Sequence, residues 1–459
     1  MPLPAPAATA TSAPASLPDP TTTVPGIGPH ANAADADADA VYGKITRRLI
    51  PFLFICYLLN FIDRSNIGFA QLQMKTSLGL SDAVYGLGAA MFFIGYALFE
   101  VPSNMLLRRI GARATILRIM VLWGLASTAT MFVQTPTQFY AVRFLLGVFE
   151  AGFFPGIVLY LTFWYPSARR TRVLALFITA QVAAAFVTSP LSGWILKHMH
   201  GLHGWEGWQW MFLIEGMPTV LLGMLVYVLL PNGPHEAKWL SAAERAVVEH
   251  ALQHDQAGHA HCPAPHVFRD PYVYLLAFGA FVAGCAGYFL AFWTPTIIRE
   301  LGVADMQMIG LYAVIPNCFA VVAMILYGRH ADRRNEQRLH WGAAFLLAAA
   351  GFLALAWTTS TSLPLTLTAI TIGGSGLVAA TPVFWALATR YLDKDKAAVG
   401  IAYINTLASI AGVSPAVVGA IKTRTGSLDG VIFLLSALLL VAAVAVTAGM
   451  RRGLAGRAR

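Results

Sequence analysis

Charged residues are scarce in this chain of 459 residues: they make up 12% of it, with 31 Lys and Arg against 22 Asp and Glu. Soluble domains carry about 25%. So few charges do not cover the surface of a water-soluble protein of this length, which excludes an ordinary cytosolic enzyme. The net charge of +9 does not indicate a nucleic-acid partner, because the cations stand in short clusters between apolar runs. We expect the lipid bilayer to be the main solvent.

Cysteine is also rare, and no CxxC pair occurs, so neither a disulfide framework nor a zinc site is indicated. The four cysteines are Cys56, Cys262, Cys285 and Cys318. A histidine-rich stretch holds metal-ligand types at His259, His261, Cys262 and His266, but a solvated run interrupted by Ala and Pro is more often a plain loop. No set of nucleophile and base lies within the apolar runs. We expect no metal, no cofactor, no catalytic residues and no enzyme activity.

Long apolar stretches are abundant, and twelve of them have the roughly 20 residues that a helix needs to cross a bilayer. They cover residues 48–72, 83–107, 113–133, 137–161, 172–196, 208–230, 271–298, 307–328, 339–359, 363–387, 397–421 and 429–450. The sequence therefore predicts an all-α membrane protein with twelve transmembrane helices in two six-helix, pseudo-symmetric halves. The expected divisions are a disordered tail at 1–42, halves at 43–230 and 271–459, and a connecting loop at 231–270.

The distribution of Lys and Arg predicts the orientation in the membrane, because positive residues near helix ends are retained in the cytoplasm. The tail, the even-numbered loops and the C-terminus hold 23 of them, against five in the odd-numbered loops. Both termini are therefore expected in the cytoplasm. Residues 1–42 lack the basic and apolar regions of a signal peptide. In the connecting loop, WLSAAERAVVEHAL has helical spacing and predicts an amphipathic helix.

A few ionisable residues fall inside the predicted spans, where charge is expensive and each one is a candidate site. They are Asp63, Arg64, Glu100, Arg143, Glu150 and Glu215. A carboxyl group in a partly dry cavity can take up and release a proton on each cycle, which suggests this role for Asp63 and Glu150. A guanidinium stays charged and matches a carboxylate, so Arg143 suits substrate binding and Arg64 is its backup. The alternative is two salt bridges that merely hold two helices together.

Other polar residues have more ordinary interpretations beside the functional one. Glu100 lies near a cytoplasmic helix end, where it can counter basic clusters and lock a gate. Glu215 is either a packing carboxylate, which we favour, or a second proton site. Tyr96, Gln181 and Asn405 lie near mid-depth and either line a cavity or form interhelical hydrogen bonds. The stretches 293–295 and 373–382 contain Gly and Pro, which predicts helix bending or close approach.

Four segments resemble the major facilitator superfamily, specifically its anion:cation symporter branch of bacterial organic-anion permeases. They are NFIDRSNIGFA (60–70), FFIGYALFEVPSNMLLRRIGAR (92–113), RFLLGVFEAGFFPGIVLYLTFWYP (143–166) and GWQWMFLIEGMP (207–218). Within that branch the sequence is similar to transporters of tartrate, 4-hydroxyphenylacetate, phthalate and sugar acids. The resemblance implies proton coupling at Asp63 and Glu150 and substrate binding at Arg143. It implies further cavity contacts at Arg64, Tyr96, Gln181, Trp385 and Asn405.

The resemblance also implies a cytoplasmic gate. Its residues would be Glu100, Arg108, Arg113, Asp332 and Arg333. The wider superfamily carries an Asp where this chain has Arg108, so other carboxylates such as Glu100 would have to serve the first copy of the gate. Asp332 keeps the acid in the second copy.

We therefore expect a monomeric, proton-coupled importer of a small organic carboxylate, tartrate-like, aromatic or a sugar acid, in the bacterial inner membrane. Alternating access would expose the site to each side in turn. One alternative is a drug/proton antiporter that exports amphiphiles on the same fold, although a buried anion-binding Arg fits that poorly. Another is a transporter-like carboxylate sensor, for which the connecting loop is a small interaction domain.

Overall fold

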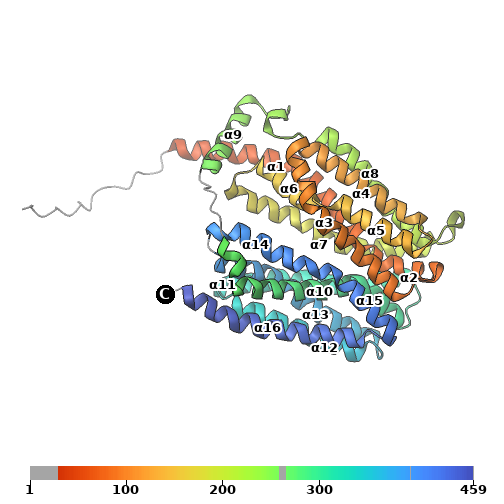
Figure 1. Cartoon of the computed structure of the whole chain (residues 1–459). Coiled ribbons are helices and arrows are strands. Elements are labelled where there is room, and N and C mark those ends of the chain that lie inside the picture. Colours follow the sequence, from red (N-terminus) through yellow and green to blue (C-terminus); the bar gives the residue numbers. More distant parts are fainter. Residues whose placement is uncertain (1–28, 258–264, 393, 458–459) are drawn as a thin grey trace, which may run out of the picture.

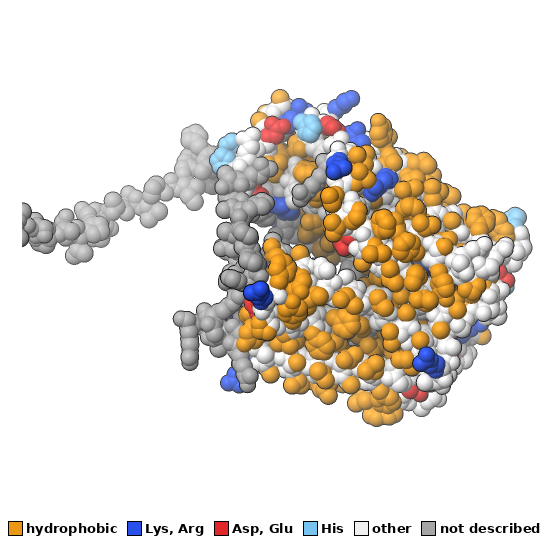
Figure 2. Space-filling view, viewed as in Figure 1, with side chains coloured by type: hydrophobic (Ala, Val, Ile, Leu, Met, Phe, Trp, Pro, Cys, Tyr) orange, Lys and Arg blue, Asp and Glu red, His pale blue; other side chains and the backbone are white. Residues whose placement is uncertain are grey.

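The computed structural model describes residues 29–257, 265–392 and 394–457. Within those residues the regular elements are all helical, and twelve segments are long and apolar enough to cross a membrane. Helices are expected there because a bilayer offers backbone N–H and C=O groups no water, so each segment must satisfy its own hydrogen bonds. Figure 2 shows hydrophobic side chains over most of the central part of the face in view, with charged side chains mainly toward its edges. The twelve-helix membrane fold is confirmed.

The helices form two groups, with the N-terminal group above the C-terminal group in Figure 1. The first comprises α1 (Pro29–Ser65), α2 (Ile67–Leu78), α3 (Asp82–Ile110), α4 (Ala112–Ala129), α5 (Pro136–Glu150), α6 (Phe153–Thr162), α7 (Ser167–His198) and α8 (Gly207–Leu229). The second comprises α10 (Pro271–Glu300), α11 (Met306–Arg334), α12 (Arg338–Thr358), α13 (Leu363–Tyr391), α14 (Lys394–Ser409), α15 (Ser414–Thr425) and α16 (Asp429–Arg457). Between them, α9 (Ala242–Ala257) covers the amphipathic stretch expected to be helical.

The first helix begins earlier than the sequence suggests. We expected a disordered tail through residue 42, whereas α1 starts at Pro29; residues 1–28 lie outside the described part. Alanine, the strongest helix former, fills much of residues 31–40, which explains why the helix continues outward from the membrane span. Asp39 in this extension forms an ion pair with Arg169 at the start of α7.

Three of the twelve spans are interrupted. Asn66 separates α1 from α2, residues 151–152 separate α5 from α6, and a 3₁₀ turn, Ile410–Val413, separates α14 from α15. Gly152 has φ 86°, a backbone conformation that favours glycine. A Cβ there would also lie 2.6 Å from the Ser103 hydroxyl, so both the backbone angle and the available space require glycine at this break. Asp63, Arg64 and Glu150 all lie within three residues of a break. Irregular backbone at membrane depth is tolerated where it is buried or lines a cavity.

Residues 293–295 and 373–382, expected to bend or to be closely approached, lie within the uninterrupted helices α10 and α13, although each helix contains an internal proline. The glycines of α13 serve close packing instead: a Cβ at Gly376 would lie 2.6 Å from the Ala344 carbonyl oxygen on α12. Small residues allow two helix backbones to approach in the absence of a hydrophobic driving force.

The two halves meet at the end of the bundle away from the chain termini, which we call the far end; the opposite one is the termini end. Helix α3 packs against α15 and α7 against α11. The backbones approach closely: a Cβ at Gly86 would lie 2.2 Å from the Pro415 carbonyl oxygen, and one at Gly310 would lie 2.3 Å from that of Ser189.

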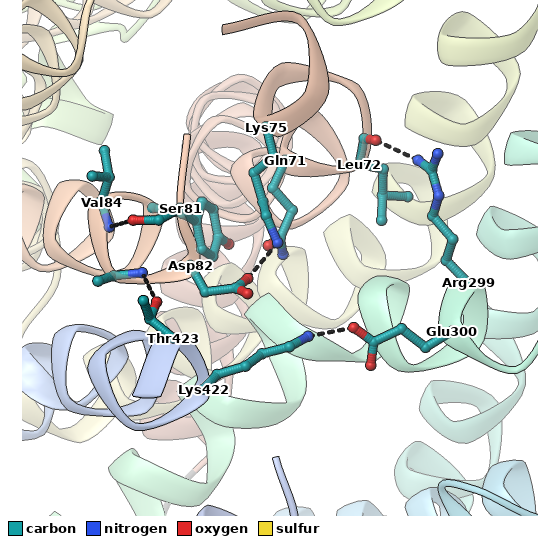
Figure 3. Close-up of polar contacts among 12 residues, drawn as sticks. Gln71, Leu72, Lys75, Ser81, Asp82, Val84, Arg299, Glu300, Lys422 and Thr423 are labelled. Atoms are coloured by element: carbon teal, nitrogen blue, oxygen red, sulfur yellow. Dashed lines mark hydrogen bonds and ion pairs between the residues drawn. The ribbon is translucent and has the colours of Figure 1, made fainter. Parts of the chain in front are cut away.

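Polar contacts reinforce this closure (Figure 3). The Arg299 guanidinium donates to the Leu72 carbonyl oxygen, and the backbone N–H of Ala83 donates to the Thr423 hydroxyl at 2.8 Å. Lys197 of α7 forms an ion pair with Asp305 before α11. Among the described residues this is the one ion pair between the halves, and every hydrogen bond between them also lies toward the far end. The protein is therefore closed at the far end.

Weakening the Lys197–Asp305 ion pair should favour opening at the far end. The hydrogen bond from Lys197, with backbone N–H groups, lowers the pKa of Asp305, so this contact is complete at neutral pH and is lost only as pH falls through that lowered pKa. The reporter is Ser189→Cys in a background without native cysteines, labelled with an impermeant maleimide. In Lys197→Ala this cysteine should react faster, because the far end opens more often. The increase should be only about two- to fivefold, because an exposed ion pair contributes little to stability. Lys75→Ala is the control, since its partner Asp82 lies in the same half. Equal acceleration in both variants would contradict the assignment.

Candidate functional site

Asp63 lies at the centre of the N-terminal half, fully buried, and is held by neutral donors from two other helices. The Trp123 indole N–H donates to its carboxylate at 2.8 Å and the Ser127 hydroxyl at 2.6 Å, both from α4. The Thr219 hydroxyl of α8 donates at 3.0 Å. Tight helix packing makes this possible, since a Cβ at Gly216 of α8 would lie 2.9 Å from the backbone nitrogen of Thr128. No ion pair joins Asp63 to a cation among the described residues.

The neighbouring Arg64 pairs with Glu150. Its Nη2 and Nε both donate to Oε1 of Glu150, the latter at 3.2 Å, while the other carboxylate oxygen, Oε2, is buried without a partner among the described residues. The Glu150 side chain is fully buried, and that of Arg64 is 22% exposed. One of the two interhelical salt bridges considered from the sequence is therefore present. The pair joins the break after α1 to the break after α5.

Arg143 is fully buried, and its three guanidinium nitrogens have no hydrogen-bond partner among the described residues. Its Cζ lies 5.1 Å from the centroid of the Phe92 ring, and the Cζ of Arg64 lies 5.2 Å from the same centroid. Two cations therefore share one aromatic ring on α3. A buried guanidinium with unused donors is poised to accept an anion.

A cavity of about 480 Å³ lies between the two halves, within the range of small-molecule sites. Its walls come from α1, α2 and α7 on one side and from α10, α11 and α13 on the other. Arg64 is the charged residue among its lining, and Gln181 also faces it. The cavity thus reaches the Arg64–Glu150 pair directly.

The rest of the lining is largely apolar and aromatic, including Phe61, Phe69, Tyr288 and Phe292. Several polar groups at the wall already use their hydrogen atoms within their own helices: Ser65 donates to the Phe61 carbonyl, Thr188 to that of Ala184 and Asn317 to that of Ala313. The hydroxyl groups of Ser189, Tyr288 and Thr294, which donate to no described residue, are further donors for a ligand beside Arg64 and Gln181. The cavity therefore offers an anion site next to an apolar space.

The other predicted cavity residues lie at different places. Tyr96 stands beside Arg64, whose Cζ is 5.4 Å from the Tyr96 ring centroid, but it is not among the lining of the cavity. Trp385 is half-buried and packs on Phe384, and Asn405 is exposed on α14; neither lines the cavity. Arg143, Asp63 and Glu150 also lie behind its wall.

The predicted gate residues lie toward the termini end, and those whose side chains the structure describes form no ion pair with one another. Arg113 pairs with Glu236 at 2.8 Å, and hydrogen bonds from Asn232 hold the pKa of Glu236 below its ordinary value, which keeps it charged. Glu100, Asp332 and Arg333 form no ion pair within the described part of the chain. The Arg108 side chain lies outside the described residues.

Sequence reasoning missed the donors to Asp63 and the ring shared by the two arginines. Ser127 and Thr219 had a weak signal, as hydroxyl groups inside apolar spans. The metal hypothesis falls largely outside the described residues, because the structure leaves His259, His261 and Cys262 undescribed. The described part contains no cluster of His, Cys, Asp and Glu that could hold a metal ion.

Comparison with known proteins places these observations in a family. Residues 53–416 match the model of the Major Facilitator Superfamily. The chain is 45% identical over 409 residues to a protein of Agrobacterium vitis named "Putative tartrate transporter", covering 88% of this chain and 90% of the relative. It is 38% identical over 404 residues to a "Quinolone resistance transporter" of Acinetobacter baumannii, covering 87% and 92%.

A solved structure supports the same fold. A bacterial homologue of the human lysosomal transporter Spinster, solved in an inward-facing and unoccupied conformation, superposes with a TM-score of 0.73 at 18% identity, covering 91% of this chain and 98% of that one. At that identity the likeness concerns the fold alone. With the twelve helices and the extent of the family match, it follows that this chain is a membrane transporter that belongs to the major facilitator superfamily.

Proposed function

We propose that this transporter is a proton-coupled symporter that imports a small organic carboxylate across the bacterial inner membrane by alternating access. The observation that carries the proposal is the Arg64–Glu150 ion pair at the wall of the central cavity. A cation that already binds one carboxylate can bind another. The termini end would face the cytoplasm, as the Lys and Arg distribution predicts, so the described closure would be on the periplasmic side.

The ion pair also provides the coupling. While Glu150 is ionised, it occupies the Arg64 guanidinium. Protonation of Glu150 removes its charge, leaving Arg64 free for the substrate carboxylate, so that proton and substrate bind together. Arg143, unpaired beside the same Phe92 ring, is a second cation that the substrate could reach in another conformation. Asp63 would carry a further proton.

The shape of the cavity favours a substrate with an apolar body. A polyhydroxy acid needs a hydrogen-bond partner for each hydroxyl group, and most of the lining is apolar, with free hydroxyl groups only at a few residues such as Ser189, Tyr288 and Thr294 among those described. An aromatic ring could stack against Phe61, Tyr288 or Phe292. An aromatic monocarboxylate therefore fits the described cavity better than tartrate or a sugar acid.

Export of amphiphilic drugs is a second candidate function, favoured by the apolar cavity and by the relative named for quinolone resistance. It requires no anion-binding cation. The buried, unpaired Arg143 and the exposed edge of Arg64 argue for the importer. We also propose that the protein acts as a monomer without enzyme activity, and that Glu100, Arg108, Arg113, Asp332 and Arg333 form the gate when the termini end closes.

Uptake into proteoliposomes tests the proposal. The probes are benzoate, 4-hydroxyphenylacetate, tartrate and gluconate, each with and without an inward proton gradient. At least one acid should accumulate with the gradient and stop accumulating when a protonophore abolishes it. Uptake at the same rate with and without the gradient would exclude proton symport. Movement of amphiphilic cations driven by the gradient, with no movement of the acids, would show that the protein is a drug exporter.

A further inference from the structure

Glu215 is a third buried carboxyl group in the N-terminal half, beside Asp63 and Glu150; it does not line the cavity and is not part of the Arg64–Glu150 pair. Its side chain on α8 is 2% exposed. Oε1 accepts a hydrogen bond from the Ser192 hydroxyl of α7 at 2.8 Å, and Oε2 has no partner among the described residues. A purely structural carboxylate would be expected to use both oxygens, because an unsatisfied buried oxygen is costly.

Unused polar groups stand next to it. Asn66, at the break between α1 and α2, is fully buried with its side chain in reach of Glu215, yet neither its amide nitrogen nor its oxygen forms a well-aligned hydrogen bond to a described residue. The Thr128 hydroxyl on α4, which lies against Gly216, is also buried and unbonded. Glu215 and Asn66 thus lie together with polar atoms that lack partners, and Thr128 places another such atom beside the next residue of α8. A small polar species there would satisfy them.

This group of residues lies between Asp63 and the far end. Thr219, which donates to Asp63, is one helical turn from Glu215 on α8, a rise of about 6 Å, and Glu215 is the residue nearer the far end. Asn66 is likewise one turn beyond Asp63 along the first span. Asp63 and Glu215 are therefore the two ends of one polar column inside the N-terminal half.

Among the described residues no cation bonds to Glu215 or Asp63, although the unpaired guanidinium of Arg143 acts electrostatically on Asp63. The elements around Glu215 contribute Ser192 from α7, Asn66 from the first break and Thr128 from α4, all neutral. The charged group that acts on Glu215 is Asp63. Arg143 can balance the charge of one of the two carboxyl groups but not of both, so at least one of them holds a proton.

We propose that Glu215, with Asn66, forms a proton-binding site that receives protons from the far end and passes them to Asp63. In the transfer, the O–H bond at Glu215 breaks and an O–H bond at Asp63 forms, leaving Glu215 ionised and Asp63 neutral. The total charge of the column is unchanged. Asn66 stabilises the protonated Glu215 carboxyl group: its amide oxygen accepts a hydrogen bond from the carboxyl O–H, and its amide N–H donates to the other carboxyl oxygen. The inference rests on the proposed proton coupling and adds the site through which protons enter.

Glu215→Gln tests the site, because it keeps the shape of the side chain and removes the titratable group. Counterflow of a radiolabelled acid, benzoate or tartrate, needs no net proton movement and should stay within about twofold of wild type. Accumulation driven by a pH gradient should fall about tenfold, since a positioned proton donor contributes at least that much. Asn66→Ala should act in the same direction. Thr130→Val is the matched control, because this buried hydroxyl already has a partner, the Ala126 carbonyl at the end of α4.

Two results would overturn the relay: Glu215→Gln accumulating substrate as wild type does, or counterflow falling in parallel with accumulation. If Glu215→Gln does not fold, Asn66→Ala decides by the same two readouts. An infrared readout separates the relay from the transport proposal. The band of a protonated carboxyl group should be present in wild type and reduced in Glu215→Gln, even if none of the acids is transported, and an unchanged band would exclude proton storage at Glu215.

Discussion

Replacing Arg64 with glutamine should lower the affinity for the transported carboxylate about 100-fold, which corresponds to about 3 kcal/mol, the cost of losing one buried charge-assisted contact. Arg64 is the charged residue that lines the cavity, and both of its bonding nitrogens now bind Glu150. Glutamine retains part of the length but no charge. The measurement is thermal stabilisation by benzoate and tartrate, followed by uptake of whichever acid binds.

Arg143→Gln is the comparison for this experiment. Arg143 is buried behind the cavity wall and does not line it, so we expect a smaller loss of affinity, about tenfold, through the second cation at the Phe92 ring. If Arg143→Gln loses more affinity than Arg64→Gln, then Arg143 is the principal substrate-binding residue, as the resemblance implies. The double variant Arg64→Gln with Glu150→Gln should recover stability, because it leaves no unpaired buried charge.

Asp63→Asn should uncouple transport from the proton gradient. Accumulation driven by pH should fall about 100-fold, within the range that a positioned acid or base contributes, while counterflow continues. The structure shows how Asp63 could accept a proton in place. The hydroxyl groups of Ser127 and Thr219 donate to it now, and either can rotate to accept a hydrogen bond from the protonated acid.

The indole of Trp123 is different, because it can only donate. Ser127→Ala should therefore reduce pH-driven accumulation more than Trp123→Phe does, each measured relative to its own counterflow. If Asp63→Asn still accumulates substrate in proportion to the gradient, Asp63 is a structural acid, and the coupling proton must be carried by Glu150 or Glu215.

The fold could be predicted largely from the sequence, because the bilayer imposes a strong rule on each span separately. A run of about 20 apolar residues has to be helical, whatever its neighbours are. Ends and breaks were less predictable. Helix α1 extends outward to Pro29, and the interruption at Gly152 depends on the Ser103 hydroxyl of another helix as well as on local preference.

The rarity of charge within the spans was also enough to name Asp63, Arg64, Arg143 and Glu150, since each is costly unless it has a partner or a cavity. The residues that contact these charges could not be predicted from the sequence. Asp63 and Arg64 are adjacent in sequence, yet one is bound by three neutral donors and the other by Glu150. Which helix faces which side chain depends on packing between segments up to 156 residues apart.

The sequence by itself thus determined the class of protein, the number of spans and the small set of charges on which transport would depend, because hydrophobicity and the cost of buried charge are properties of single segments. The tertiary structure alone decided that the far end is closed, that Arg64 and not Arg143 meets the cavity, and that Glu215 and Asn66 lie together with unused polar atoms. Those facts depend on the relative placement of helices, which close packing of small residues and interhelical hydrogen bonds establish only in the assembled bundle.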